Sequence, residues 1–375
     1  MPGINQVFAT QSGGSGLADL AYGVMEDFQK DQVAQTQRYQ AHPGVRRLLM
    51  VAESSAGGPH RTDIRIKEPG NTRFIAPFEI TANYRVDLNR VLYSNYKHIE
   101  GSYIMDEKED AFTSRDDRRI NDHLQQQYNG VITEHWDTCE GGVWGNPASS
   151  GDQTTVVGMR SMLPGLAASE TSNGSFNGRY GRYGNGVAFS VIQGQDLTDT
   201  ANARLTRWAA TYDGSIGEQT FAIINAARLA TAFQFVPGLR QILGSPGTGA
   251  PAATYTAGGS FLAVPTTQFL AFADYANKKI SDGSDGEVNR MFGEIMVDGM
   301  VIVHTPYLDN FNDAPMYGVN TEEIYARKLA DRLFRWLKPQ QLGVEIWKIA
   351  CITSFLMHNR NPRRSGFVIH KKFNT

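Results

Sequence analysis

The sequence predicts an α+β protein, and three features indicate it. Helical and strand-like segments are intermixed along the 375 residues without a regular strand–helix–strand rhythm. One helix, predicted over Ser114–Gly142, is long for a globular domain. A charged β-ribbon precedes it with no neighbouring helix to cover it, although isolated two-stranded ribbons are marginal in water. The ribbon must therefore be covered by something else.

The long helix is the clearest single element. Ser114 and Asp117 have the spacing of a capping box, and Gly141-Gly142 predict the end of the helix. About 26 helical residues span about 39 Å. The large or apolar residues at helical spacing are Ile120, Leu124, Tyr128, Val131, Ile132, His135, Trp136 and Cys139. An ordinary core helix explains this pattern, but its place between an extended arm and a large mixed domain makes it informative.

The first 43 residues predict an arm. Residues 1–16 are polar and rich in Gly and Ser, and Leu17–Lys30 has helical spacing of apolar residues that include Val24, Met25 and Phe28. Polar sequence follows as far as His42-Pro43-Gly44. Two interpretations stay open. The amphipathic segment either docks on another molecule or packs as an N-terminal helix on its own core.

The ribbon is predicted from alternating residues. Ile64 and Ile66 share one face of a strand while Arg65 and Lys67 share the other. Phe74 lies on the returning strand, beyond a turn signal at Pro69-Gly70-Asn71. The predicted strand segments are 48–51, 62–68, 72–80 and 84–105.

The remaining chain is mixed. Loops rich in Gly, Pro, Ser or Thr are expected over 141–155 and 244–259. Helices are predicted over 218–234 and 320–337, and strands over 261–264, 295–304 and 367–370, with an apolar stretch over 342–358.

Composition narrows the function classes. A net charge of −2 argues against a protein that grips nucleic acid over its whole surface, although a local basic face stays possible. Two cysteines, Cys139 and Cys351, form no disulfide framework and indicate buried packing residues in a reducing compartment. No run of 18 apolar residues and no signal-peptide pattern is present, so we expect no membrane span and a cytosolic origin.

Motifs for catalysis are absent from the sequence. It contains no GxxxxGK[ST], HExxH, CxxC or GxSxG, and the acidic loop Asp282–Glu287 misses the EF-hand spacing. His123 and His135 lie twelve residues apart on one helix, too far to share a metal. We therefore predict no catalytic, cofactor-binding or metal-binding residue and no cofactor. An enzyme whose site is set by geometry alone remains an alternative.

Two basic features have two interpretations each. The run Arg179–Tyr183 interleaves Arg and Tyr, which suits base stacking or, with this near-neutral charge, protein–protein contacts. A second cluster, which faces a polyanion or is a solvated tail, comprises Arg360, Arg363, Arg364, Lys371 and Lys372.

The order of these segments resembles the major capsid protein of tailed bacteriophages, the Hong Kong 97-type coat fold. The resemblance rests on ordered pieces over some 350 residues, because this family has no invariant motif. The pieces are the arm, the ribbon, the long helix followed by GGVWGNPASS and GMRSMLPGL, then NAARLATAF, FLAVPTTQFLAFADYAN, FGEIMVDGMVIVHTPY and the closing WKIACITSFLMHNRNPRRSGFVIH.

The resemblance implies a domain plan. Residues 1–43 would form an N-arm and 44–96 an extended β-ribbon, the E-loop. Residues 97–155 with 340–375 would form a peripheral domain containing a spine helix over 114–140, and 156–339 would form mainly an axial domain. Neighbouring subunits would cover the arm and ribbon through Val24, Met25, Phe28, Ile64, Ile66, Lys67 and Phe74.

The resemblance also implies a function. Copies of the chain would assemble into pentamers and hexamers of an icosahedral head that encloses double-stranded DNA, in the virion, after assembly in the bacterial host cytoplasm. Implied partners are other copies, a portal, a separate scaffolding protein, a decoration protein and packaged DNA held non-specifically. Lys67 lies where some members carry a crosslinking lysine, but its carboxylate and asparagine partners are not identifiable. An encapsulin-like nanocompartment shell is the nearest alternative.

Overall fold

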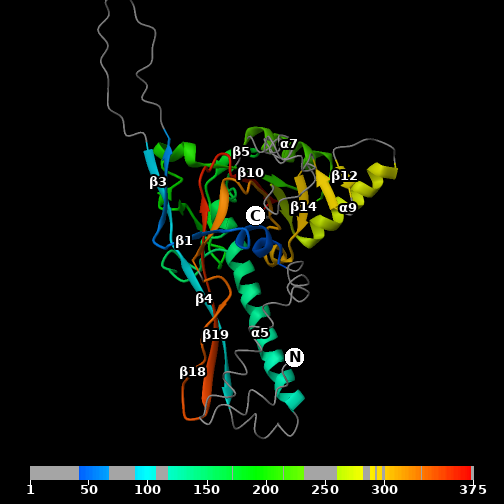
Figure 1. The fold of residues 1–375 in the computed structure, drawn as a ribbon. Coiled ribbons are helices and arrows are strands. Elements are labelled where there is room, and N and C mark those ends of the chain that lie inside the picture. Colours follow the sequence, from blue (N-terminus) through cyan, green and yellow to red (C-terminus); the bar gives the residue numbers. More distant parts are fainter. Residues whose placement is uncertain are drawn as a thin grey trace, which may run out of the picture.

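The computed structural model confirms a protein of mixed helix and sheet content (Figure 1). It describes residues 42–66, 89–106, 117–170, 172–213, 215–231, 260–281, 288–291, 294–297, 300–330 and 332–372. Two large sheets share one body, from which a long helix and two strands extend as an arm. No helix in these ranges is long and apolar enough to cross a membrane.

The larger sheet has eight strands and is buried on both faces. Along β11, Phe261 and Ala263 point into one hydrophobic cluster while Leu262 and Val264 point into the other, as the two-residue period of a strand requires. In spatial order its strands are β12 (Val288–Met291), β13 (Glu294–Val297), β14 (Met300–His304), β11 (Phe261–Val264), β15 (Met316–Val319), β20 (Gly366–Lys371), β10 (Arg207–Tyr212) and β5 (Ser175–Gly178).

Helices cover the two faces of this sheet. One face packs on α7 (Glu218–Ala230) and α9 (Thr266–Ser281) through Phe221, Ile224 and Phe272. The other face packs on the end of α5, on α6 (Met159–Met162) and on the π-helical turn η1 (Val45–Leu49). The predicted helix 218–234 and strand 261–264 are therefore confirmed over their described residues.

The second sheet carries the arm. Its order is β1 (Glu53–Ser55), β16 (Ile324–Leu329), β19 (Ile346–Asn359) and β17 (Arg335–Trp336), with β4 (Lys97–Asp106) and β18 (Gln340–Gln341) also paired to β19. β4 and β19 run antiparallel from Lys97↔Phe355 to Asp106↔Ile346. The long helix α5 (Asp117–Trp144) lies beside these two strands (Figure 1).

A small hydrophobic cluster fixes α5 to the strands. Tyr128 of the helix stacks on Trp336, with ring centroids 4.8 Å apart, and Val131 lies in the same cluster as Ile349 and Cys351. Across the exposed helix face, Thr133 and Thr138 donate to the carbonyls four residues earlier. The predicted long helix is thus confirmed over its described length.

The ribbon leaves the body at the end opposite to the arm (Figure 1). β2 (His60–Arg65) pairs antiparallel with β3 (Asn89–Ser94), so that Arg65 faces Asn89. The remaining short elements are β6 (Gly181–Arg182), β7 (Ala188–Phe189), β8 (Val191–Ile192), β9 (Gln195–Asp196), η2 (Thr200–Leu205) and η3 (Pro306–Asn310).

Several sequence predictions are wrong in detail. The helix predicted over 320–337 is replaced by strands, because β16 pairs with β19 and buries Ile324 and Ala326 with a period of two. The strand predicted over 48–51 is instead the end of η1 and the turn after it. The single strand predicted over 295–304 is a hairpin of β13 and β14. The partner of β2 is β3, not the predicted strand 72–80, which lies outside the described residues.

The glycine pair Gly141-Gly142 does not end α5, which continues to Trp144. A Cβ on Gly141 would lie 3.1 Å from the Tyr307 hydroxyl, and one on Gly142 would lie 3.2 Å from the Phe355 ring. These glycines let two aromatic side chains approach the helix instead of turning the chain. The predicted capping box at Ser114 lies outside the described residues.

Candidate functional site

The candidate site is a group of polar contacts where η1, the ribbon, β16 and β19 meet. It has three parts: an anchor that ties the chain near His42 to α5, a histidine network at the root of the ribbon, and a groove between them. We describe each part in turn.

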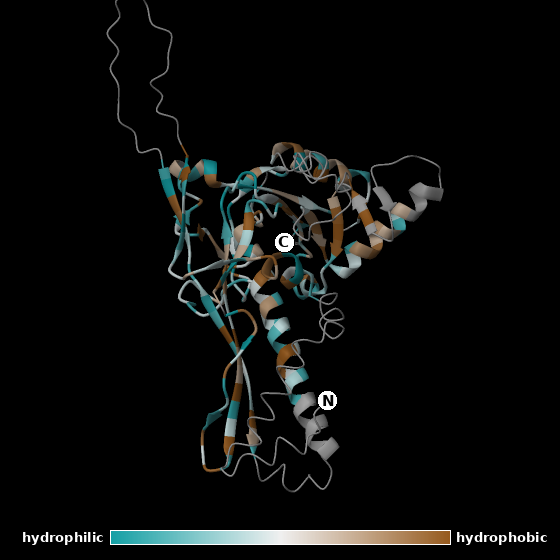
Figure 2. Cartoon of the chain, in the orientation of Figure 1, coloured by the Kyte–Doolittle hydropathy of each residue, from teal (hydrophilic) through white to brown (hydrophobic). Residues whose placement is uncertain are grey.

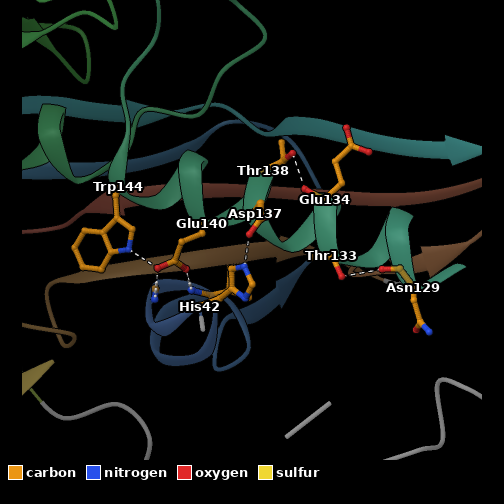
Figure 3. A network of polar contacts seen from close by, with 10 residues as sticks. His42, Asn129, Thr133, Glu134, Asp137, Thr138, Glu140 and Trp144 are labelled. Atoms are coloured by element: carbon orange, nitrogen blue, oxygen red, sulfur yellow. Dashed lines mark hydrogen bonds and ion pairs between the residues drawn. The ribbon is translucent and has the colours of Figure 1, made fainter. Parts of the chain in front are cut away.

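The anchor is built around Glu140 in the last turns of α5 (Figure 3). Its carboxylate accepts the backbone N–H groups of Gly44 at 2.9 Å and Val45 at 2.8 Å, and the indole N–H of Trp144 at 2.7 Å. The two backbone groups open η1, where N–H groups lack partners within their own helix. Glu140 therefore caps a helical turn 95 residues earlier in the sequence.

Burial sets the electrostatics of this carboxylate. Glu140 is only 3% exposed, and burial raises its pKa, while hydrogen bonds from Gly44, Val45 and Trp144 partly offset the rise. Close approach also requires Gly44, because a Cβ there would lie 2.5 Å from Trp144 Nε1. The anchor thus depends on one glycine and one fully hydrogen-bonded carboxylate.

A second contact extends the anchor by one helical turn. His42 Nε2 lies 2.5 Å from Asp137 Oδ1 (Figure 3). The His42 ring meets Trp136 edge-on, with ring centroids 5.9 Å apart. His42 is buried, whereas the Asp137 side chain is 66% exposed. The chain is therefore fixed to α5 from its first described residue, at the root of the predicted arm.

The histidine network joins the ribbon to the body. His358 of β19 is fully buried and bonds to both strands of the ribbon, through Nε2 to Thr62 Oγ1 at 2.9 Å and through Nδ1 to Ser94 Oγ at 3.0 Å. Gln193 donates its amide to the same Nδ1 at 3.2 Å. His60 packs edge-on against His358 at 4.5 Å.

This environment keeps His358 neutral. The pKa of His358 is lowered to about 3, mainly by burial and to a smaller extent by the charges of His60 and Arg327. Burial and Arg327 also lower the pKa of His60. A proton on Nδ1 would face the Gln193 donor, so protonation would break the network that sets the direction of the ribbon.

The base of the ribbon is covered by its own chain. Ile66 is 1% exposed and packs with Leu92 against Ile192, Leu197 and Leu205, and Ile64 is half-buried against the same cluster. Within one copy, Ile192, Leu197 and Leu205 cover Ile66, and its predicted contact with a neighbouring subunit stays a prediction. No local pattern in this turn-rich segment predicted that it would pack against the ribbon.

Between the anchor and the network lies a groove of about 740 Å³. We call it the η1–ribbon groove. Its walls come from η1, β1, β2 and β16. The charged side chains that line it are Arg47, Arg61, Arg327, Arg360, Glu53, Asp63 and Glu322, together with His60.

Apolar residues lie near the tip of the arm formed by α5, β4 and β19 (Figure 2), and several of them are exposed. Val344 is 90% exposed in the connection between β18 and β19, and Leu342 is 58% exposed beside it. Ile104 on β4 is 65% exposed on the paired strand. Such a cluster at the end of a projecting element is typical of a surface that another molecule covers.

The other predicted residues have separate positions. Cys139 and Cys351 are buried free thiols, as expected, and burial raises the pKa of each. Within the Arg179–Tyr183 run, Tyr183 stacks on Phe189 of the same chain at 4.3 Å. In the basic tail, Arg363 donates to the carbonyls of Ala203 and Arg204 and is therefore a structural residue. Predicted contacts Val24, Met25, Phe28, Lys67 and Phe74 lie outside the described residues.

The contacts of this site hold together segments that are distant in the sequence. Within the described ranges, no group of three or more His, Cys, Asp or Glu side chains could hold a metal ion. Neither Glu140 nor His358 was a candidate in the sequence. Apart from Trp144, four residues after Glu140, the hydrogen-bond partners described above lie at least 95 residues away in the chain, so no local spacing marks these two residues.

Comparisons with known proteins identify the fold. No protein-family model and no curated protein matches the chain. The chain is similar to the capsid of cyanophage A-1(L), with 9% identity, a TM-score of 0.58, and coverage of 88% of this chain and 93% of that one. Two matches with TM-scores below 0.5 carry no weight: the capsid of Myoviridae phage XM1 (0.48, 10% identity, 85% and 87% coverage) and that of a native GTA particle (0.46, 9%, 87% and 89%). The chain therefore has the fold of a phage capsid protein, as the order of its sequence segments implied.

Proposed function

We propose that this chain is the major capsid protein of a tailed bacteriophage, which self-assembles into the pentamers and hexamers of an icosahedral head around double-stranded DNA. The observation that carries the proposal is the match to the cyanophage capsid over 88% of this chain and 93% of that chain. Near-complete coverage of both chains means that the whole architecture corresponds, not one common motif.

The projecting elements support this proposal. The arm of α5, β4 and β19 and the ribbon leave the body at opposite ends (Figure 1), so one copy has two widely separated surfaces. Contacts between two different surfaces of identical copies close into rings when the rotation allows it. The exposed Val344 and Leu342 give the arm apolar surface for such a contact.

The domain plan follows the sheets. Residues 1–43 form the N-arm and 44–96 the E-loop ribbon. The six-stranded sheet with α5 forms the peripheral domain, and the eight-stranded sheet with α7 and α9 forms the axial domain. The sequence plan placed β20, within 340–375, in the peripheral domain and β16, within 156–339, mainly in the axial domain. We propose the opposite assignment for these two strands, because β20 pairs with β10 and β15 and β16 pairs with β19.

We assign contacts between copies to the N-arm, residues 1–43, and to the ribbon. Val24, Met25 and Phe28 dock on a neighbour, and Lys67 and Phe74 contact the subunit beneath the ribbon. Ile64, half-buried at the ribbon base, contributes only its remaining exposed surface.

The proposed partners are further copies of the chain, a portal, a separate scaffolding protein, a decoration protein and packaged DNA held without sequence recognition. The protein acts in the virion after assembly in the bacterial host cytoplasm. It acts as a structural protein, without an enzymatic reaction or a cofactor.

Sedimentation velocity of the purified protein, with the Leu342→Asp/Val344→Asp variant alongside, tests this function. We expect the wild type to form large particles and the variant to remain as small species with unchanged circular dichroism, because charge at the arm tip blocks a contact between copies. Lys338→Asp, at another exposed position near the arm, is the control and should assemble. A wild-type protein that stays a small oligomer under all assembly conditions would overturn the proposal. Particles that enclose a protein cargo instead of DNA would favour the nanocompartment alternative.

A further inference from the structure

The η1–ribbon groove has no assigned occupant, and its charge indicates one. Arg61 and Arg360 are exposed on its walls. Within the described residues neither forms an ion pair, although the charge of Arg360 acts on the nearby Glu323 carboxyl and lowers its pKa, against the effect of burial. Among the residues that the structure describes, Arg327 forms an ion pair with one carboxylate, that of Glu53, at 3.5 Å. The groove therefore presents cationic groups without full compensation.

Both positively and negatively charged side chains line the η1–ribbon groove. Glu53, Asp63 and Glu322 stand among the four arginines, which leaves a small excess of positive charge besides His60. A uniform polyanion such as a nucleic-acid backbone would meet three carboxylates there. A protein segment that is mainly acidic but carries a lysine complements this lining better, because charges of both signs find opposite partners.

The chain itself contains such a segment. Residues 106–110 read Asp-Glu-Lys-Glu-Asp, four carboxylates around one lysine. Its first residue, Asp106, is the last residue of β4, at the far end of the arm. The other acidic run, 282–287, has three carboxylates in six residues and no lysine.

The segment cannot reach the groove of its own copy. Asp106 pairs with Ile346 at one end of β19, whereas His358, which contacts the groove residue His60, lies twelve residues away along the same strand. At about 3.3 Å per residue this separation is about 40 Å. The helix that follows the segment runs along the same arm, so the occupant must come from a second copy.

We propose that the η1–ribbon groove of one copy binds the acidic segment 106–110 of a neighbouring copy, so that each arm tip docks at the root of another copy's ribbon. This proposal rests on the proposed function, because assembly supplies the second copy. The contact joins the two ends of the molecule, and it is heterologous, as ring closure requires.

A charge swap tests this contact. Arg61→Glu/Arg360→Glu in the groove and Glu107→Lys/Glu109→Lys/Asp110→Lys in the segment should each raise the subunit concentration needed for assembly by about tenfold or more, because like charges then face each other. The variant with all five changes should recover most of this loss. Arg335→Glu/Lys371→Glu, two exposed cations outside the groove, is the matched control and should assemble as the wild type does.

Recovery by the combined variant supports the pairing. The pairing would be overturned if the variant with all five changes assembled no better than the two partial variants. It would also be overturned if the groove variant assembled normally. Recovery of the groove variant by Asp282→Lys/Asp285→Lys/Glu287→Lys instead would show that the other acidic run is the occupant and would also overturn the proposal.

A cysteine pair gives an independent result. Arg61→Cys with Glu109→Cys in one chain should form intermolecular disulfides on oxidation of assembled particles, seen as a ladder of covalent multimers. Each single variant should stay monomeric on the gel, since Cys139 and Cys351 are buried. Particles without a ladder would refute this contact while leaving the shell function intact, whereas absence of wild-type particles would refute the shell function itself.

Discussion

At the residue scale, a few buried polar side chains fix the segments that project from the body. Glu140 receives three N–H donors, and His358 binds both strands of the ribbon. Removing a partner from such a buried group leaves it unsatisfied, which costs more than the hydrogen bond contributes. These residues are therefore expected to set where the N-arm and the ribbon leave the subunit.

Gly44→Ala tests the anchor. The new Cβ would lie 2.5 Å from Trp144 Nε1 and 3.0 Å from Glu140 Oε2, so the indole or the chain must move. We expect the unfolding free energy of the dissociated subunit to fall by about 1–3 kcal/mol, measured by urea denaturation. Unchanged stability together with unchanged protection of η1 from hydrogen exchange would show that the anchor tolerates displacement.

His358→Gln tests the ribbon root through pH. Because burial lowers the folded pKa of His358 from 6.5 to about 3, the unfolded chain binds a proton first as pH falls. The stabilisation is complete above pH 6.5 and is lost progressively down to about pH 3. Between these two pH values, the unfolding free energy of the wild type should fall more steeply with decreasing pH than that of His358→Gln. The difference in slope should reach about 1.4 kcal/mol per pH unit.

Thr62→Val provides the control for this measurement. It removes one hydrogen bond of His358 but keeps the titrating imidazole, so it should lower stability while retaining a steep slope. His135, whose pKa burial lowers to about 4, is present in all three proteins and cancels from the comparison. Equal slopes in the wild type and His358→Gln would contradict a neutral, buried role for His358.

At the scale of the element, α5 shows what local sequence predicts well and where tertiary contacts prevail. The helical spacing of Tyr128, Val131, Trp136 and Cys139 predicted its buried face, and these four residues are buried. Its end was misplaced because Gly141 and Gly142 make room for Tyr307 and Phe355. A glycine pair signals a helix end or a close approach, and only the packed structure distinguishes them.

The segment 320–337 makes the same point for strands. Its Glu, Ala, Arg and Leu residues favour a helix locally, yet Ile324 and Ala326 alternate into the core because β16 pairs with the 14-residue β19. Pairing with a long central strand outweighs a propensity difference of a few tenths of a kcal/mol per residue. Contacts over nearly 100 residues or more, such as Glu140 with Gly44, leave no local pattern at all.

Gly130→Ala tests the account of α5 and is the counterpart of the Gly44 variant. Gly130 is exposed within the helix, and a Cβ there would meet nothing within 4 Å. We expect the dissociated subunit to gain about 1 kcal/mol of unfolding free energy, from lower backbone entropy in the unfolded chain. A loss of stability would mean that α5 needs a flexible point at this position.

At the scale of the whole molecule, the order of segments predicted the fold better than any single segment did. The N-arm, ribbon, long helix and closing strands together resembled one architecture. The cyanophage capsid protein matches that architecture at 9% sequence identity. Physical constraints of packing maintain such a fold while individual residues change. The sequence alone did not reveal the groove, because it forms only when η1, β2 and β16 meet.

A triple variant tests the predicted N-arm: Val24→Asp/Met25→Asp/Phe28→Asp. If these side chains dock on a neighbour, the dissociated subunit should keep its unfolding free energy while particle yield falls, as measured by denaturation and sedimentation. Gln29→Asp, at a polar position of the same segment, should change neither. A subunit that unfolds when the three apolar residues are changed would place the segment in its own core instead.

Electron cryo-microscopy of the purified protein under assembly conditions tests the central claim most directly. The account predicts closed particles built from rings of five and six copies, with each arm tip against the ribbon root of a neighbour. A discrete small oligomer that never forms rings or shells would contradict it and would require a function other than capsid assembly.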